Sequence, residues 1–298
     1  MHTLLAVGAL LTAVHAGTAS EFRLAAFKAD VTCPMGHALM GGGIAPAQEV
    51  LTPLYAKGVV LLGPDQPIVF CAVDWCEIRN DAYDLWRDAL AEAAGTTRER
   101  VLVAAVHQHD TPVADFQAQR LLDEQGLEKA LCDVPYVRDC VARTADALKA
   151  SLAAAQPVTH YGMGEAAVEG VSSNRRVVAD DGSVSFPRNS ATTDAAIRDA
   201  PIDLHDPMLK TLSFWNGGKP VAALHAYSVH PMSFYGKGGV NYDFVGMARE
   251  QRQQDDPDVF QIYFSGCSGD TTAGKYNDGA PENRPVLAER MYQGMVKA

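Results

Sequence analysis

Apolar runs of strand length alternate with amphipathic stretches along the whole chain, which predicts strands mixed with helices. The runs that predict strands cover 22–31, 54–62, 67–75, 101–106, 158–163, 209–215, 221–229 and 259–264. The stretches with helical spacing and one apolar face cover 81–94, 137–154, 243–253 and 285–296. Because both patterns occur from end to end, we expect an α/β (mixed α+β) fold with a central mixed β-sheet flanked by helices. Residues 172–207 are polar and rich in turn formers, and we expect them to form part of a site wall.

The first twenty residues follow a different pattern. They contain no Asp, Glu, Lys or Arg, and the apolar run 4–16 is too short to span a bilayer. Small residues follow it, as at the cleavage site of a secretory signal peptide. We therefore expect a signal peptide at 1–19, a folded domain at 20–298, and a secreted or periplasmic protein. The alternative is a buried N-terminal helix.

Composition and charge exclude some classes of protein. The 298 residues carry 25 Lys and Arg against 36 Asp and Glu, a formal net charge of −11. Phosphate contacts need clustered basic residues, so nucleic acid is not an expected partner. Six cysteines form an even set, and export would permit disulfides. Cys132 and Cys140 are the nearest plausible pair, whereas Cys71 lies in an apolar run typical of a buried free thiol.

Polar residues follow three of the predicted strands, at the point where each strand ends. His107-Gln108-His109-Asp110 follows 101–106, His230-Pro231-Met232-Ser233 follows 221–229, and a segment rich in Gly and Ser follows 259–264. In open α/β sheets, sites form outside the carboxyl ends of the strands. If these strands are neighbours, the three polar segments meet at one edge.

The His107-x-His109 pair is the strongest indication of chemistry. In an extended segment, residues i and i+2 lie on the same face, so two imidazoles can bind one cation or divide metal binding and acid–base work between them. A pair of hydrogen-bonded surface histidines is the alternative, and His230 at a second strand end favours the metal. His225 falls on the opposite face of its strand, which indicates a core histidine.

Taken together and in order, these motifs resemble the catalytic N-terminal domain of the neutral (non-lysosomal) ceramidases. The segments that carry the resemblance are Ala29-Asp30-Val31-Thr32, Met40-Gly41-Gly42-Gly43, His107-Gln108-His109-Asp110-Thr111-Pro112, Asn174-Arg175, Val229-His230-Pro231-Met232-Ser233, Tyr242-Asp243-Phe244-Val245-Gly246 and Gly269-Asp270-Thr271-Thr272. They cover roughly residues 22–274.

The resemblance implies hydrolysis of a ceramide-like N-acyl amide with one Zn²⁺ ion. It implies His107 and His230 as zinc ligands, His109 as proton donor near the scissile amide, and Arg175 as the group that holds the substrate or its oxyanion. The Gly-Asp motif adds two further expected catalytic residues, Asp270 and Thr272, the latter in place of the family's Ser.

The family's last two zinc ligands, a Glu and a Tyr, lie downstream of the Gly-Asp motif. On that resemblance we expect the domain to be incomplete at its C-terminus. If the site is completed within this chain, the substitute ligands are Asp74, Asp243 and Asp270.

Two alternative functions stay open. One is another metallohydrolase, acting on an ester, lactone or phosphoester, although His109 is followed by Asp110-Thr111-Pro112 and does not match the metallo-β-lactamase signature. The other is a non-catalytic secreted binding domain. As partners we expect a small-molecule or lipid amide substrate and a peripheral contact with a membrane surface. The sequence does not indicate an oligomeric state.

Overall fold

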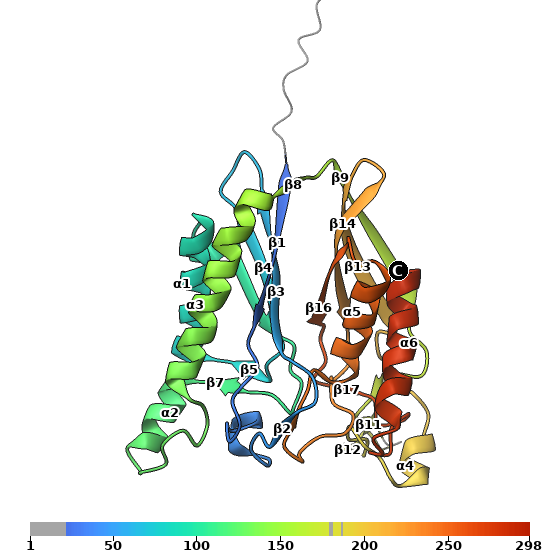
Figure 1. Cartoon of the computed structure of the whole chain (residues 1–298). Coiled ribbons are helices and arrows are strands. Elements are labelled where there is room, and N and C mark those ends of the chain that lie inside the picture. Colours follow the sequence, from blue (N-terminus) through green and yellow to red (C-terminus); the bar gives the residue numbers. More distant parts are fainter. Residues whose placement is uncertain (1–21, 179–180, 186) are drawn as a thin grey trace, which may run out of the picture.

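The computed structural model describes residues 22–178, 181–185 and 187–298, so the predicted signal peptide lies outside the described residues. Two β-sheets face each other, and each carries helices on its outer side (Figure 1). The first sheet comprises, in spatial order, β6 (Val101–Ala105), β4 (Ile68–Val73), β3 (Tyr55–Leu62), β1 (Arg23–Asp30) and β8 (Gln156–Pro157). The second comprises β16 (Phe260–Ser265), β14 (Lys219–Tyr227), β13 (Met208–Asn216) and β9 (His160–Ala167).

The first sheet is antiparallel except for the pair β4–β6, which is parallel. Its outer face packs on α1 (Asn80–Ala94) and α3 (Val134–Ser151). Trp75 and Trp86 meet edge to face in this layer, with ring centroids 5.6 Å apart, and both are fully buried. The apolar side chains that the sequence pattern assigned to one helix face therefore form the core on this side.

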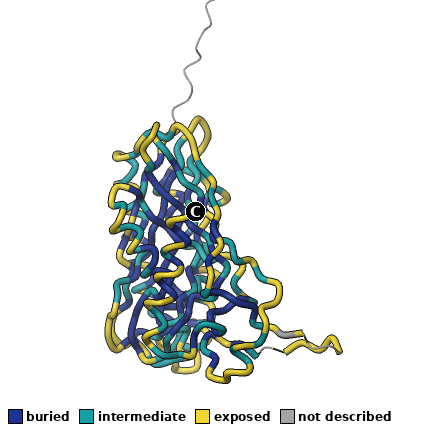
Figure 2. The backbone as a smooth tube through the Cα atoms, turned by 90° about the vertical axis from the view of Figure 1, so that its right-hand side faces the viewer, coloured by how far each residue is buried: buried dark blue, intermediate teal, exposed yellow. Residues whose placement is uncertain are grey.

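The second sheet combines antiparallel pairs with the parallel pair β14–β16. The helices α5 (Asp243–Asp255) and α6 (Asn283–Lys297) cover it and pack against each other. Figure 2 shows the buried positions running along the strands, with exposed positions at the turns.

Shorter elements complete the described chain. The helices among them are η1 (Met40–Gly42), η2 (Arg98–Arg100), α2 (Phe116–Asp123), η3 (Leu152–Ala154) and α4 (Ala195–Asp199). The strands are β2 (Glu49–Val50), β5 (Glu77–Ile78), β7 (Val113–Ala114), β10 (Ser173–Asn174), β11 (Val177–Val178), β12 (Val184–Ser185), β15 (Gly239–Val240) and β17 (Thr271–Thr272).

The predicted α/β class is confirmed, but the long strands divide between two main sheets, whereas we expected one, and the short strands form four separate pairs: β10–β17, β11–β12, β15–β2 and β5–β7. The strands before the three polar segments divide accordingly: β6 lies in the first sheet, and β14 and β16 are neighbours in the second. Their carboxyl ends still converge, because the Ser265 hydroxyl donates a hydrogen bond of 2.6 Å to the carbonyl oxygen of Val106. The candidate site therefore lies between the sheets.

All six cysteines are free, so the expected pair Cys132–Cys140 is wrong. Cys132 precedes the N-cap residue Asp133, and Cys140 lies two turns into α3. A spacing of eight residues corresponds to about 12 Å along a helix axis, beyond the Cα separation of a disulfide. Cys71 is buried, as predicted. Within the described part of the chain, no helix combines the length and apolar character needed to cross a membrane.

Candidate metal site

Three histidines from the two sheets meet at the carboxyl ends of β6 and β14. The ring centroids of His107, His109 and His230 lie 4.7 to 5.3 Å apart, each pair in an edge-to-face arrangement. One ring nitrogen from each lies within 4.8 Å of the others, which is the geometry of a metal-binding group. The convergence predicted from the strand ends is therefore present in the fold.

Backbone carbonyls orient two of these rings. The Nδ1–H group of His107 donates to the carbonyl oxygen of Cys76 at 2.7 Å, and that of His230 donates to Ser268 at 3.2 Å. A carbonyl can only accept, so these bonds place the proton on Nδ1 and leave the Nε2 lone pair free for a ligand. Metal-binding histidines are commonly held in this way.

His109 faces His230 directly, with 3.2 Å between their Nε2 atoms. Two free lone pairs at that distance repel each other, so without a cation His109 Nε2 carries a proton and donates to His230. The Nδ1 atom of His109 is then a buried acceptor without a hydrogen-bond partner. Such an atom indicates a place for a ligand or a water molecule.

The charges around the cluster favour neutral imidazoles. Burial lowers the pKa of His109 to about 3, and the neighbouring histidines and Arg175 add to the effect. Burial also lowers the pKa of His230 to about 4, with His107 adding to it. Since a metal binds the neutral form of imidazole, both rings are ready ligands at neutral pH.

The histidine geometry fits a small tetrahedral cation. Two ligand nitrogens at about 2.0–2.1 Å from such an ion lie roughly 3.3 Å apart. The separation of 3.2 Å between the Nε2 atoms of His109 and His230 agrees with that value. The cluster could therefore supply two or three nitrogen ligands and leave at least one of four positions open, as in catalytic sites.

Arg175 and Asp270 lie beside the histidines. The Arg175 side chain acts electrostatically on both His109 and His230, and its backbone N–H donates to the carbonyl oxygen of Asp270 at 2.9 Å. The Asp270 carboxylate pairs with Arg176 at 2.5 Å. The polar segment 172–207 therefore contributes to the site through β10 and Arg175, as expected.

Thr272 has a different environment from the one expected of a reacting hydroxyl. It is fully buried in β17, and its hydroxyl donates to the carbonyl oxygen of Asn189 at 3.1 Å. The adjacent Thr271 hydroxyl is buried without a partner, and the Thr271 carbonyl oxygen accepts the His230 N–H at 3.2 Å. The sequence motif alone does not distinguish these two neighbouring threonines.

None of the three substitute carboxylates joins the histidine cluster, which corrects that expectation. Asp74 pairs with Arg249, Asp243 accepts from Ser233, and Asp270 pairs with Arg176. Each carboxylate thus has a basic or hydroxyl partner elsewhere. His225 is a core residue, as predicted, because its ring contacts Thr211 at 2.8 Å and Gln261 at 2.9 Å.

Sequence reasoning missed three neighbours of the cluster. Tyr235 packs edge to face on His109, with ring centroids 4.9 Å apart. Cys76 approaches His107 with its thiol as well as its carbonyl group, and Cys76, Glu77 and His107 form a second group with ligand atoms within 4.8 Å of one another. None of the three residues lies in a motif, and only the folded chain brings them to the histidines.

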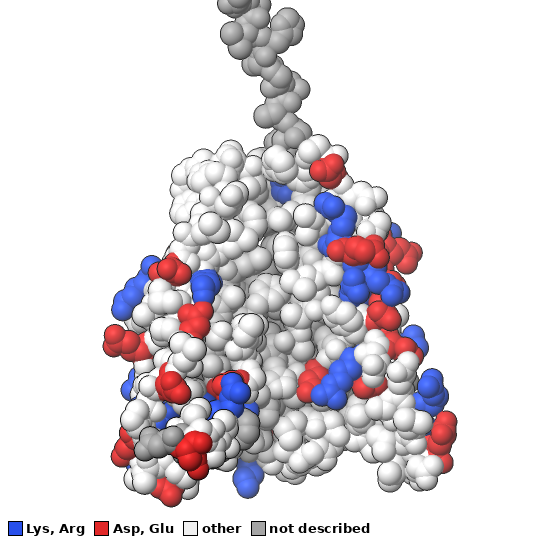
Figure 3. All heavy atoms as spheres, turned by 180° about the vertical axis from the view of Figure 1, so that it is seen from behind, with Lys and Arg blue, Asp and Glu red and all other residues white. Residues whose placement is uncertain are grey.

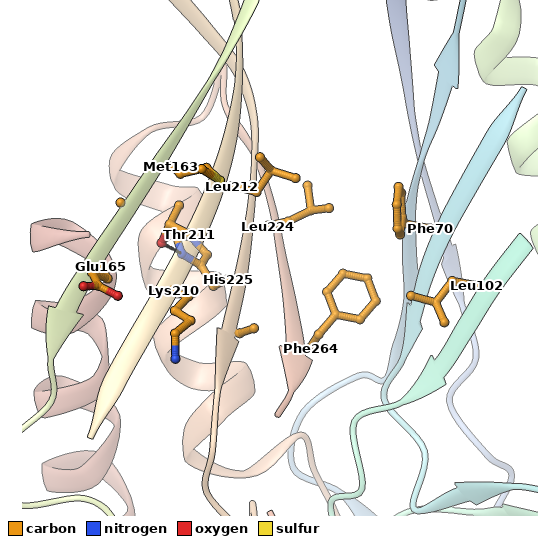
Figure 4. A pocket seen from close by; sticks show the side chains of 12 residues that line it. Phe70, Leu102, Met163, Glu165, Lys210, Thr211, Leu212, Leu224, His225 and Phe264 are labelled. Atoms are coloured by element: carbon orange, nitrogen blue, oxygen red, sulfur yellow. Dashed lines mark hydrogen bonds between the residues drawn. The ribbon is translucent and has the colours of Figure 1, made fainter. Parts of the chain in front are cut away.

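An apolar groove opens between the sheets beside this site. It has a volume of about 680 Å³, and Phe70, Leu102, Leu212, Leu224 and Phe264 contribute to its lining (Figure 4). None of the three histidines lines the groove. The groove is connected to them through Phe264, because the next residue, Ser265, donates a hydrogen bond to Val106, which precedes His107. Seen from behind, the molecule is hollowed along the line between its two halves, and charged side chains gather on the flanks (Figure 3).

Fold and site together define a two-sheet α/β domain with a histidine cluster able to hold a metal between the sheets. No family model and no curated protein matches the sequence. Among solved structures, the chain is similar to a ceramidase complexed with C2, with 16% identity and a TM-score of 0.68 over 93% of this chain and 43% of that one. It is also similar to the neutral ceramidase from Pseudomonas aeruginosa, with 16% identity and a TM-score of 0.65 over 93% and 44%. The chain therefore has the fold of the matched part of these ceramidases and spans less than half of their length.

Proposed function

We propose that this chain belongs to a secreted zinc-dependent hydrolase that cleaves an N-acyl amide of the ceramide type. The observation that carries the proposal is the convergence of His107, His109 and His230 at 3.2 Å between nearest nitrogens, within a ceramidase fold. The set of nitrogen ligands and the nearly tetrahedral spacing favour zinc.

Zinc at this site would polarise the amide carbonyl and lower the pKa of a bound water toward about 7. The residues of this chain would supply the rest. His107 and His230 would hold the metal through Nε2. His109, whose ring faces the same space, would take up the proton released by the attacking water and pass it to the leaving nitrogen. Arg175 stabilises the negative charge that develops on the carbonyl oxygen.

The groove between the sheets supports an apolar substrate. Its lining side chains are mostly aliphatic or aromatic, and its end at Phe264 lies close to the residues that lead into the histidine turn. We propose that it takes an acyl chain, so that the scissile amide lies at the histidines. Contact with a membrane surface would follow from such a substrate.

The direct test replaces the ligands. We expect His107→Ala and His230→Ala to lose stoichiometric zinc, measured by elemental analysis, and to lose hydrolysis of N-acyl amides. His160→Ala is the matched control, because its ring stacks on Trp215 away from the cluster. Full zinc occupancy in both ligand variants would refute the assignment. A panel of amides, esters, lactones and phosphoesters separates the reaction classes, and zinc without any turnover would indicate a binding domain.

A further inference from the structure

Gln108, the residue between His107 and His109, has a distinct environment. The rings of His107 and His109 face His230, whereas the Gln108 side chain is fully buried. Its Nε2 atom donates to the Asp74 carboxylate at 3.1 Å and lies 3.4 Å from the carbonyl oxygen of Tyr242. Both partners only accept, so the orientation of the amide is determined.

Asp74 is itself held rigidly. Arg249 donates two parallel hydrogen bonds to its carboxylate, at 2.8 and 2.9 Å, and the Tyr55 N–H adds a third at 3.0 Å. Asp74 follows β4 in the first sheet, whereas Arg249 lies on α5 beside the second (Figure 1). The pair therefore joins the two halves of the molecule directly behind the histidine turn.

The Asp74–Arg249 pair is part of a larger ionic network. Arg249 also donates to Glu250 at 2.9 Å, and Glu250 pairs with Lys57 at 3.2 Å and with the partly exposed Lys28 at 3.9 Å. Three basic and two acidic groups thus form one chain that ends at Gln108. The side chains of Asp74, Lys57 and Arg249 are at most 1% exposed, and buried groups paired in this way are held in one arrangement.

The backbone at His107 needs such support. Its φ angle is +78°, in the left-handed region that residues with a Cβ atom avoid. Residues in this conformation persist where surrounding contacts determine it. The His107 N–H donates to the Trp75 carbonyl oxygen at 2.9 Å on one side of the turn, and Gln108 supplies the anchor on the other.

We propose that the hydrogen-bond chain Gln108–Asp74–Arg249 positions the histidine turn so that His107 and His109 face His230. Gln108 is then a positioning residue for the metal site, and this inference rests on the proposed function for its metal. Gln108, the middle residue of the His-x-His motif, then orients the two histidines on either side of it.

The test compares Gln108→Met, which keeps the length of the side chain and loses its hydrogen bonds, with Gln261→Met. Gln261 is equally buried but contacts His225, away from the cluster. Three quantities are measured: zinc affinity by competition with a chromophoric chelator, the visible spectrum of the Co²⁺-loaded protein, and hydrogen exchange of the His107 amide in the metal-free protein. Gln108→Ser, which leaves room for a water molecule, replaces the methionine variant if that one does not fold.

We expect Gln108→Met to weaken zinc binding by about 10- to 100-fold, as changes behind metal ligands do. We also expect altered Co²⁺ bands and faster exchange at His107, with none of these changes in Gln261→Met. If the native chain binds zinc and the zinc affinity of Gln108→Met is within twofold of the native value, the positioning proposal is wrong, while the proposed function stands. If the native chain binds no zinc, the proposed function fails, and an unchanged exchange rate at His107 then overturns the positioning proposal as well.

Discussion

Replacing Arg249 with methionine should destabilise the fold strongly, because it leaves the Asp74 carboxylate buried without its counter-charge. Both side chains are at most 1% exposed, and two hydrogen bonds of 2.8 and 2.9 Å join them. Removing one partner of a buried ion pair costs about 3–5 kcal/mol. Donors from Gln108 and Tyr55 remain on Asp74, so we expect the lower part of this range.

The assay is urea unfolding followed by circular dichroism, with thermal unfolding as a second measurement. A loss of about 3 kcal/mol in the free energy of unfolding corresponds to a fall of about 5 °C in the melting temperature of a domain of this size. Arg98→Met is the matched control. Arg98 also binds an aspartate, Asp88, through two nitrogens, but on the surface, where such pairs contribute little.

The double variant Asp74→Asn/Arg249→Met separates a lost charge pair from lost packing. Removing both charges leaves no unpaired ion, so we expect it to be more stable than Arg249→Met by about 1–3 kcal/mol. If Arg249→Met unfolds at the same urea concentration as Arg98→Met, the pair does not hold the sheets together. If the double variant is no more stable than Arg249→Met, the cost comes from packing and the electrostatic argument is refuted.

Three further predictions address the turn, the core and the groove. His107→Gly should be more stable than His107→Ala by about 1 kcal/mol in urea unfolding, because only glycine adopts a φ of +78° without steric cost; equal stability would contradict this. Burial lowers the pKa of His225 to about 4, below its unfolded value of 6.5, so the unfolded chain takes up a proton first as pH falls. The contribution of neutral His225 to the free energy of unfolding is therefore present above pH 6.5 and is lost between pH 6.5 and 4, by up to about 3 kcal/mol. His225→Gln should flatten the pH profile of stability in this window, and an unchanged slope would argue against this role of His225. Leu102 lines the groove and is 46% exposed. Leu102→Glu should raise the KM for long-chain N-acyl amides about tenfold and leave the KM for short-chain amides unchanged, because a charge opposes burial of an alkyl chain. An equal effect on both substrates would exclude the groove as the acyl site.

The strands and main helices could be predicted from the sequence because their apolar patterns are local. The run 101–106 became β6 (Val101–Ala105), and 243–253 became α5 (Asp243–Asp255). The division into two sheets could not be predicted in this way. Runs such as those of β4 and β14 have the same apolar character, and their pairings with β6 and β16, which lie a helix or more further along the chain, assign them to different sheets.

The convergence of the three histidines could also be predicted from the sequence, because the histidines follow apolar runs of strand length. The residues that surround the histidines could not be predicted in this way. Asp74 and Arg249 are 175 positions apart, and each is an ordinary charged residue in the sequence. The local pattern of Gln108, likewise, does not show that its amide reaches Asp74.

The position of the cluster between two sheets has a physical consequence for any metal it binds. His107 and His109 follow β6 of the first sheet and His230 follows β14 of the second, so the ligand geometry depends on the separation of the sheets. Ser265 joins the sheets at one side, and Asp110, which follows His109, accepts from the backbone of Gly236 near His230 at 2.8 Å. A cation held by His107 and His230 would add a further link across the same boundary. Because it binds only the assembled arrangement, it stabilises the fold in proportion to the logarithm of its concentration. The contacts that hold the sheets together are therefore also the contacts that set metal affinity.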